Sequence, residues 1–186
     1  MRPCLYKLKL NPYQYKKGCL MTVDSATLSV LVLGIGNLVM SDDAVGVLVA
    51  QRLQQEFRFA ENVEVMDGGT LGLDLLPKLE NITNLILIDA VETGKKAGTC
   101  VRLSGQELPI ALQTKVSPHQ MGLKDLLAVS ELMGHSPKDM VLIGVQPGSI
   151  EMEIGLTPEV EAQLDCLVAN VLSELKNWGI EAVPKV

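Results

Sequence analysis

The sequence contains few aromatic residues and few cysteines, and each shortage excludes a class of protein. Aromatic residues make up 3% of the 186 residues, so an interior has to be built from aliphatic side chains. Cys4, Cys19, Cys100 and Cys166 are widely spaced and form no Cys-x-x-Cys pair, which argues against a zinc ribbon and a disulfide framework. We therefore expect free thiols in a reducing cytoplasm.

Clustered positive charge and long apolar runs are also missing. The chain carries 16 basic and 22 acidic residues, a net charge of −6, whereas nucleic acids and anionic membranes attract clustered positive charge. The densest apolar run, 30–40, is interrupted by glycines and falls short of the roughly 20 residues that a spanning helix needs. We expect neither a nucleic acid nor a membrane as partner.

Residues 1–27 differ in composition from the rest of the chain. They combine lysines, prolines and tyrosines without a helical or strand period, so they are predicted to be a flexible tail. Residues 28–183 are predicted to form a single α/β domain, and we expect a monomer.

Within that domain, short apolar runs alternate with helix-start signals, which is typical of βα units. The runs predicted as strands are Ser29–Leu33, Val63–Met66, Leu85–Ile88 and Met140–Gly144. Helices are predicted to begin at Ser41, Thr70, Ser117-Pro118 and Thr157-Pro158, with Ser41, Thr70 and Ser117 as N-caps. A strand near Thr99–Leu103 is the expected antiparallel exception. The pattern predicts a three-layer αβα sandwich, with a mostly parallel twisted sheet of about five strands and helices on both faces.

Acidic residues follow three of the predicted strands. Asp42 and Asp43 come after the first, Asp67 ends the second and Asp89 ends the third, while His119 opens a later helix. Because ligands of open α/β sheets bind beyond the carboxyl ends of the strands, these groups are predicted to converge on one edge. Two carboxylates and an imidazole suit a divalent metal ion.

Each of these residues also has a purely structural interpretation. Asp42 at a helix start would complement the helix dipole, and Asp67 before two glycines would accept backbone hydrogen bonds in a turn. His135 is predicted to be an exposed residue at a helix end. The Gly34-x-Gly36 turn also begins like a nucleotide-binding loop, but the two following aspartates would repel a pyrophosphate at the helix start.

Several short motifs occur in an order that resembles the hydrogenase maturation proteases. They are Gly34-x-Gly36-Asn37, Ser41-Asp42-Asp43-x-x-Gly46, Asp67-Gly68-Gly69-Thr70, Asp89-Ala90, Ser117-Pro118-His119-Gln120 and Gly155-Leu156-Thr157-Pro158. The resemblance covers about residues 29 to 181. It implies an endopeptidase that trims a C-terminal extension from the large-subunit precursor of a nickel–iron hydrogenase after nickel insertion.

The resemblance also implies a metal site. The family's divalent-metal ligands match Asp43, Asp89 and His119, and the site is expected to recognise the nickel that the substrate already holds. Asp43 stands where many members carry glutamate, one methylene longer. Asp67 matches a further acidic position, so Asp43, Asp67 and Asp89 are the candidate catalytic carboxylates.

The chemistry of peptide cleavage stays open at the level of sequence. No Ser-His-Asp or Cys-His arrangement is visible, which leaves a metal-activated water, a pair of carboxylates as acid and base, or the substrate nickel as electrophile. A non-enzymatic metal-binding or metal-delivery module using the same ligands is the alternative function. Such modules usually carry His-rich or Cys-rich tracts, and the sequence has none.

Truncation of the tail tests the predicted domain boundary. Residues 1–20 precede the first predicted strand and lack apolar periodicity, so a chain that starts at Met21 should unfold at the same urea concentration as the full chain. A loss of more than about 1 kcal/mol in the free energy of unfolding would contradict this boundary.

Overall fold

The computed structural model describes the backbone of residues 28–105, 107–108 and 118–185, and the side chains of the same residues except 118–121. The predicted tail, residues 1–27, and the predicted cap Ser117 lie outside the described residues. Within them, no helix is both long and apolar enough to cross a membrane.

Five strands form the main sheet, in the order β3-β1-β4-β6-β5. The parallel strands are β1 (Val30–Ile35), β3 (Val63–Gly69), β4 (Asn84–Ala90) and β6 (Asp139–Val145). β5 (Cys100–Ser104) runs antiparallel to β6 at the edge of the sheet, as the sequence predicts. All of the predicted strands are therefore confirmed, with ends that are shifted or extended by up to three residues.

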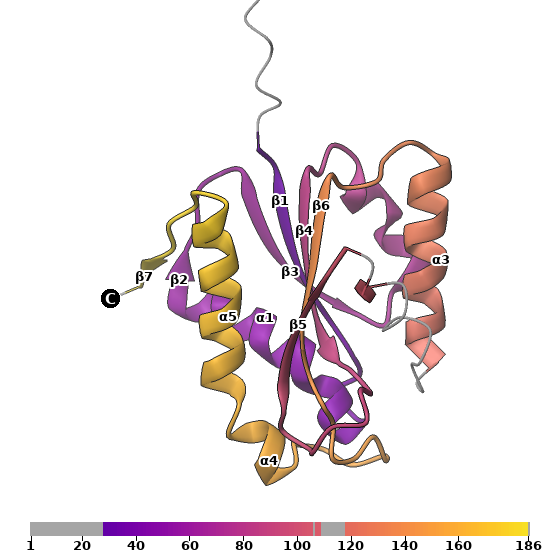
Figure 1. Cartoon of the computed structure of the whole chain (residues 1–186), viewed down its shortest axis with the longest axis vertical. Coiled ribbons are helices and arrows are strands. Elements are labelled where there is room, and N and C mark those ends of the chain that lie inside the picture. The colour runs from indigo at the N-terminus through magenta and orange to yellow at the C-terminus, as the bar shows by residue number, and fades with distance from the viewer. Residues whose placement is uncertain (1–27, 106, 109–117, 186) are drawn as a thin grey trace, which may run out of the picture.

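Helices cover both faces of the sheet, as Figure 1 shows. α1 (Val45–Glu56) and α5 (Leu164–Asn177) lie on one face, and η2 (Gly72–Leu79) and α3 (Pro118–Leu132) lie on the other. Two short strands, β2 (Phe57–Arg58) and β7 (Val183–Pro184), pair antiparallel and join the end of the chain to the end of α1. The predicted three-layer α/β sandwich is confirmed.

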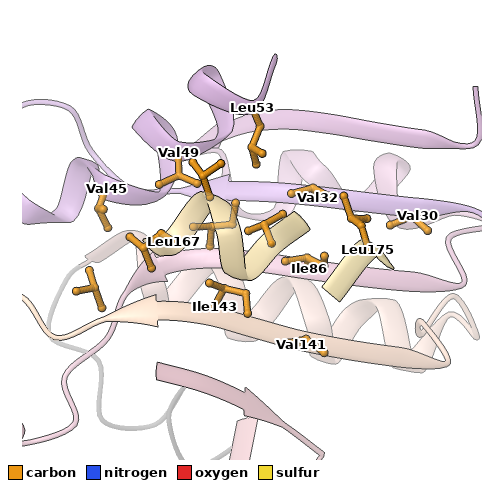
Figure 2. Close-up of a cluster of buried hydrophobic side chains, with 14 of the residues drawn as sticks. Val30, Val32, Val45, Val49, Leu53, Ile86, Val141, Ile143, Leu167 and Leu175 are labelled. Atoms are coloured by element: carbon orange, nitrogen blue, oxygen red, sulfur yellow. The ribbon is translucent and has the colours of Figure 1, made fainter. Parts of the chain in front are cut away.

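Valine and leucine alternate along β1 and divide the core into two halves. Val30 and Val32 pack with the residues of α1 and α5, as Figure 2 shows, whereas Leu31 and Leu33 pack with those of η2 and α3. Successive side chains of a strand point to opposite faces, so a strand that is buried on both faces has to be apolar at every position. That requirement explains the uninterrupted apolar runs in the sequence.

The helix starts differ from the predicted ones. Ser41 is not an N-cap: it lies inside a short 3₁₀ helix, η1 (Ser41–Ala44), with φ of +47°, and α1 follows directly. Thr70 caps nothing either, because η2 is a 3₁₀ helix with Leu71 at its N-cap position. Pro77 lies inside η2, where it lacks the N–H that an α-helical hydrogen bond would require.

The last predicted helix consists of two helices. It begins at Pro158 as predicted, but α4 (Pro158–Glu161) ends after one turn, and α5 begins separately at Leu164. α5 ends before Gly179, whose φ of +77° lies in the left-handed region that glycine adopts readily. Gly179 therefore ends the helix as the sequence predicts.

The two described cysteines differ in their environment, and thiol labelling should report that difference. The Cys100 thiol donates a hydrogen bond to Gln163 Oε1 at 3.6 Å, while Cys166 is exposed. Burial, assisted by the neighbouring Cys166 thiol, raises the pKa of Cys100 to about 12. Because the thiolate is the reactive form, iodoacetamide at pH 8 should modify Cys166 well before Cys100 in the folded protein. Peptide mass mapping of the labelled chain measures both rates, and equal rates would contradict this expectation.

Candidate active site

The candidate site lies where the chain reverses its direction across the sheet. From β1 the chain goes to β3 on one side, and it then returns to β4 on the other side. The connections that leave β1 and β4 at their carboxyl ends therefore diverge, which opens a crevice at this point in doubly wound folds. Asp43 lies on the connection after β1, and Asp89 lies near the end of β4.

Two glycines allow η1 and α1 to approach the sheet closely. A Cβ atom on Gly46 would lie 2.2 Å from the Ile88 carbonyl oxygen and 2.3 Å from that of Ile35. A Cβ atom on Gly36 would lie 1.8 Å from the Asp43 carbonyl oxygen, and its φ is +146°. No larger residue fits at these positions, and the spacing of the glycines thus fixes Asp43 above the ends of β1 and β4.

Both carboxylates of the predicted site are buried. Asp43 is 1% exposed and Asp89 is 0% exposed. Asp43 Oδ2 accepts a hydrogen bond of 3.0 Å from the Asn37 N–H, which orients the carboxylate toward the loop after β1. Asp89 shares the sheet face of Leu87 and Val91, because residues two apart in a strand point the same way. This face is the one that η2 and α3 cover.

The third predicted ligand, His119, is the second residue of α3. Its side chain lies outside the described residues, but its helix is placed. α3 packs on η2, where a Cβ atom on Gly122 would lie 3.1 Å from the Gly72 Cα atom. η2 begins directly after β3, so the first turns of α3 lie at the carboxyl edge of the sheet, on the face of Asp89. Among the described side chains, no group of three His, Cys, Asp or Glu residues could hold a metal ion.

Asp67 lies on the opposite face of the sheet from Asp89. It follows Val63 and Val65 along β3, both of which pack on the α1 side. Its Oδ2 accepts a hydrogen bond of 2.9 Å from Gln51 Nε2 of α1, and its Oδ1 accepts one of 3.0 Å from the Gly69 N–H. The second bond is the turn interaction that the structural interpretation predicts. The structure therefore does not bring Asp67 together with Asp89.

Asp42 has a larger role than the predicted helix-dipole interaction, and that expectation is corrected here. Its side chain is 0% exposed and accepts hydrogen bonds from three backbone N–H groups and one hydroxyl. Gly148 N and Ser149 N donate to Oδ2 at 2.7 and 3.1 Å, and Thr157 N donates to Oδ1 at 2.7 Å. The Thr157 hydroxyl, at 2.8 Å from Oδ2, bonds to this carboxylate instead of capping α4. Asp42 thus joins η1 to the loop after β6.

Gln146, at the end of β6, was not singled out by the sequence. It is 4% exposed, and its Oε1 accepts hydrogen bonds from Thr93 N at 2.7 Å and Thr93 Oγ1 at 3.0 Å. Its Nε2 donates to Glu92 at 3.0 Å, so Gln146 fixes the loop after β4. A polar residue directly after the apolar run 140–145 was the available signal, since a buried amide requires partners.

The start of η1 cannot bind a phosphate as a nucleotide-binding loop does. Its backbone N–H groups are already used within the protein: Ser41 N donates to Glu153 O, Asp42 N to Ser149 O and Asp43 N to Met40 O. Two buried carboxylates stand beside them. Since a phosphate site depends on available N–H groups at a helix start, the geometry disfavours the nucleotide interpretation.

The other histidine is remote from this edge. His135 follows the C-terminal end of α3, where its N–H donates to Ser130 O. It is half-buried there, and not exposed as predicted.

Comparison with known sequences gives one consistent result. A sequence profile described as "Hydrogenase maturation protease" matches residues 47–174. The hydrogenase 2 maturation protease of Escherichia coli (strain K12) is 42% identical over 157 residues, which span 84% of this chain and 96% of that protein. The hydrogenase expression/formation protein HupD of Rhodobacter capsulatus is 43% identical over 154 residues, or 82% of this chain and 73% of that protein.

Comparison with solved structures agrees with the sequence comparison. The hydrogenase maturating endopeptidase HybD from E. coli superimposes with a TM-score of 0.81 at 40% identity, covering 85% of this chain and 98% of that one. The [NiFe] hydrogenase maturation protease HybD from Thermococcus kodakarensis has a TM-score of 0.64 at 26% identity, covering 79% and 99% of the two chains.

Asp42→Asn tests the structural role of this carboxylate. The asparagine amide would present an NH₂ group where the carboxylate now accepts hydrogen bonds, so we expect a loss of about 3 kcal/mol in the free energy of unfolding. A helix-dipole interaction alone would account for at most about 1 kcal/mol. Urea titration distinguishes the two values. Asp165→Asn, at an exposed ion pair with Arg52 in the first turn of α5, is the control and should cost less than about 1 kcal/mol.

Proposed function

Because the chain belongs to the hydrogenase maturation protease family and is therefore an endopeptidase, we propose that it removes the C-terminal extension of a nickel–iron hydrogenase large-subunit precursor after nickel insertion. The family match supports the reaction class. The observation that carries the proposal is the burial of Asp43 and Asp89 at the carboxyl ends of β1 and β4, the place where doubly wound folds bind their ligands. We place this reaction in the cytoplasm and expect the protein to act as a monomer.

The proposed role of the site is to recognise the nickel that the substrate already holds. Asp43 and Asp89 supply carboxylate oxygens and His119 supplies an imidazole nitrogen, a donor set that suits a divalent ion. The face of the sheet to which Asp89 belongs is also the face that α3 covers, and α3 carries His119 in its first turn. Asp67, held by Gln51 on the opposite face, is not included among the nickel ligands.

In this proposal the chain positions a peptide bond beside buried carboxylates. A nickel ion bound there would act as a Lewis acid toward the scissile carbonyl. Asp43 is fixed by the Asn37 N–H, and its burial keeps bulk water from screening its charge. A carboxylate in such surroundings can accept a proton from an attacking water and return it to the leaving amine.

A metal-delivery module with the same ligands is the competing function. It would bind nickel without shortening any protein. Incubation of the purified chain with nickel-loaded and nickel-free precursor separates the two functions, because only a protease produces the shorter subunit on a denaturing gel. We expect cleavage of the nickel-loaded precursor alone. An intact nickel-loaded precursor would contradict the proposed function.

Ligand substitutions in the same assay test the site residues. Asp43→Asn, Asp89→Asn and His119→Ala should each lower the cleavage rate by at least about 100-fold, because each removes a metal ligand. Asp43→Glu should remain active, since it keeps the carboxylate that many family members carry. His135→Ala, at the far end of α3, is the control and should cleave at the unchanged rate. Equal losses in His119→Ala and His135→Ala would show that the histidine is misassigned.

A further inference from the structure

Exposed apolar side chains gather at the edge of the sheet that carries the candidate site. Of the nine large apolar side chains that are exposed in the described part of the chain, six lie on segments that directly follow β1, β3 or β6. These six, which we call the apolar rim, are Leu38, Val39, Leu71, Leu73, Met152 and Ile154. Since soluble proteins rarely expose contiguous apolar groups, such a set indicates an interaction surface.

Backbone hydrogen bonds join the three segments of the apolar rim into one structure. Gly36 N donates to Gly69 O at 3.0 Å, which links the segment after β1 to the end of β3, where the next segment begins. Ser41 N donates to Glu153 O at 2.8 Å, which links the segment after β1 to the segment after β6. The three segments that carry the apolar rim are therefore neighbours at this edge of the sheet, and Asp43 lies on the same short η1 helix as Ser41.

The loop that exposes Met152 and Ile154 is fixed at both ends. Asp42 accepts hydrogen bonds from Gly148 and Ser149 before the loop tip and from Thr157 after it. Met152 and Ile154 are therefore held at the surface before any partner binds. A pre-ordered surface reduces the entropy lost on association, which is the general advantage of a rigid docking site.

Building on the proposed function, we infer that the apolar rim is the surface on which the folded body of the precursor protein docks, outside the peptide that is cut. The exposed Glu151 and Glu153 flank Met152, so the complementary surface combines apolar side chains with lysine or arginine. A second copy of this chain is a poor occupant, because a symmetric contact would bring the same glutamates of both copies together.

Two double substitutions of exposed apolar side chains test the apolar rim. Met152→Gln combined with Ile154→Gln removes two apolar contacts, and Ile154 is 85% exposed in the free protein. Leu132→Gln combined with Met133→Gln is the control, because Leu132 is 86% exposed at the C-terminal end of α3, at the opposite end of the fold. Both double variants should keep the melting temperature of the parent chain.

The measurement is cleavage of nickel-loaded precursor over a range of precursor concentrations. We expect the rim variant to raise KM by about tenfold at unchanged kcat, because it weakens docking and not chemistry. The control variant should leave both values unchanged. Equal KM values for the rim variant and the parent, or equal increases in both double variants, would overturn the inference.

Two further readouts separate the possible occupants. A Glu151→Lys, Glu153→Lys variant should also raise KM, and most strongly at low salt, if the precursor surface is basic. Size-exclusion chromatography should show the same mass for the parent and the rim variant, and a parent dimer that the rim variant abolishes would assign the surface to a second copy instead. If the parent chain does not cut the nickel-loaded precursor, the proposed function is wrong. If the parent cuts it and the rim variant has an unchanged KM, only the docking inference is wrong.

Discussion

The burial of the Asp42 carboxylate is the interaction on which the whole carboxyl edge of the sheet depends. Three backbone N–H groups and the Thr157 hydroxyl converge on it, from residues more than one hundred positions away in the chain. A buried carboxylate is tolerated only when such donors compensate for its lost hydration. The same bonds that make Asp42 acceptable in the interior therefore also define the loop after β6 and the start of α4.

Asp42 and Asp43 have identical side chains and are both buried, but they have different roles. The groups that donate hydrogen bonds to the Asp42 carboxylate lie on Gly148, Ser149 and Thr157 in the loop after β6, so its charge is used for structure. The Asp43 carboxylate accepts a hydrogen bond from the loop after β1 and lies at the carboxyl ends of β1 and β4. The close approach allowed by Gly46 places both residues, since α1 could not otherwise lie against the Ile35 and Ile88 carbonyl groups. Steric fit and electrostatics thus act together at one short 3₁₀ helix.

The two faces of the sheet are used differently. On the α1 face, Asp67 is engaged by Gln51 and contributes to the packing of helix on strand. On the η2 and α3 face, Asp89 follows the four apolar residues 85–88 of β4 and shares the sheet face that packs against the helix carrying His119. The exposed side chains of the apolar rim lie on segments at this same edge. The edge thus combines buried carboxylates with exposed apolar side chains.

The sequence by itself determined the three-layer fold. A strand that is covered by helices on both faces has to be apolar at every position, and Val30–Leu33 meets this requirement. The sequence also placed Asp43 and Asp89 at one edge, since parallel strands end together. Only the tertiary structure decided the role of Asp42, the face of Asp67 and the 3₁₀ form of η1 and η2. Those outcomes rest on hydrogen bonds between distant segments, such as Asp42 with Thr157, and a local pattern of residues carries no information about which segments meet.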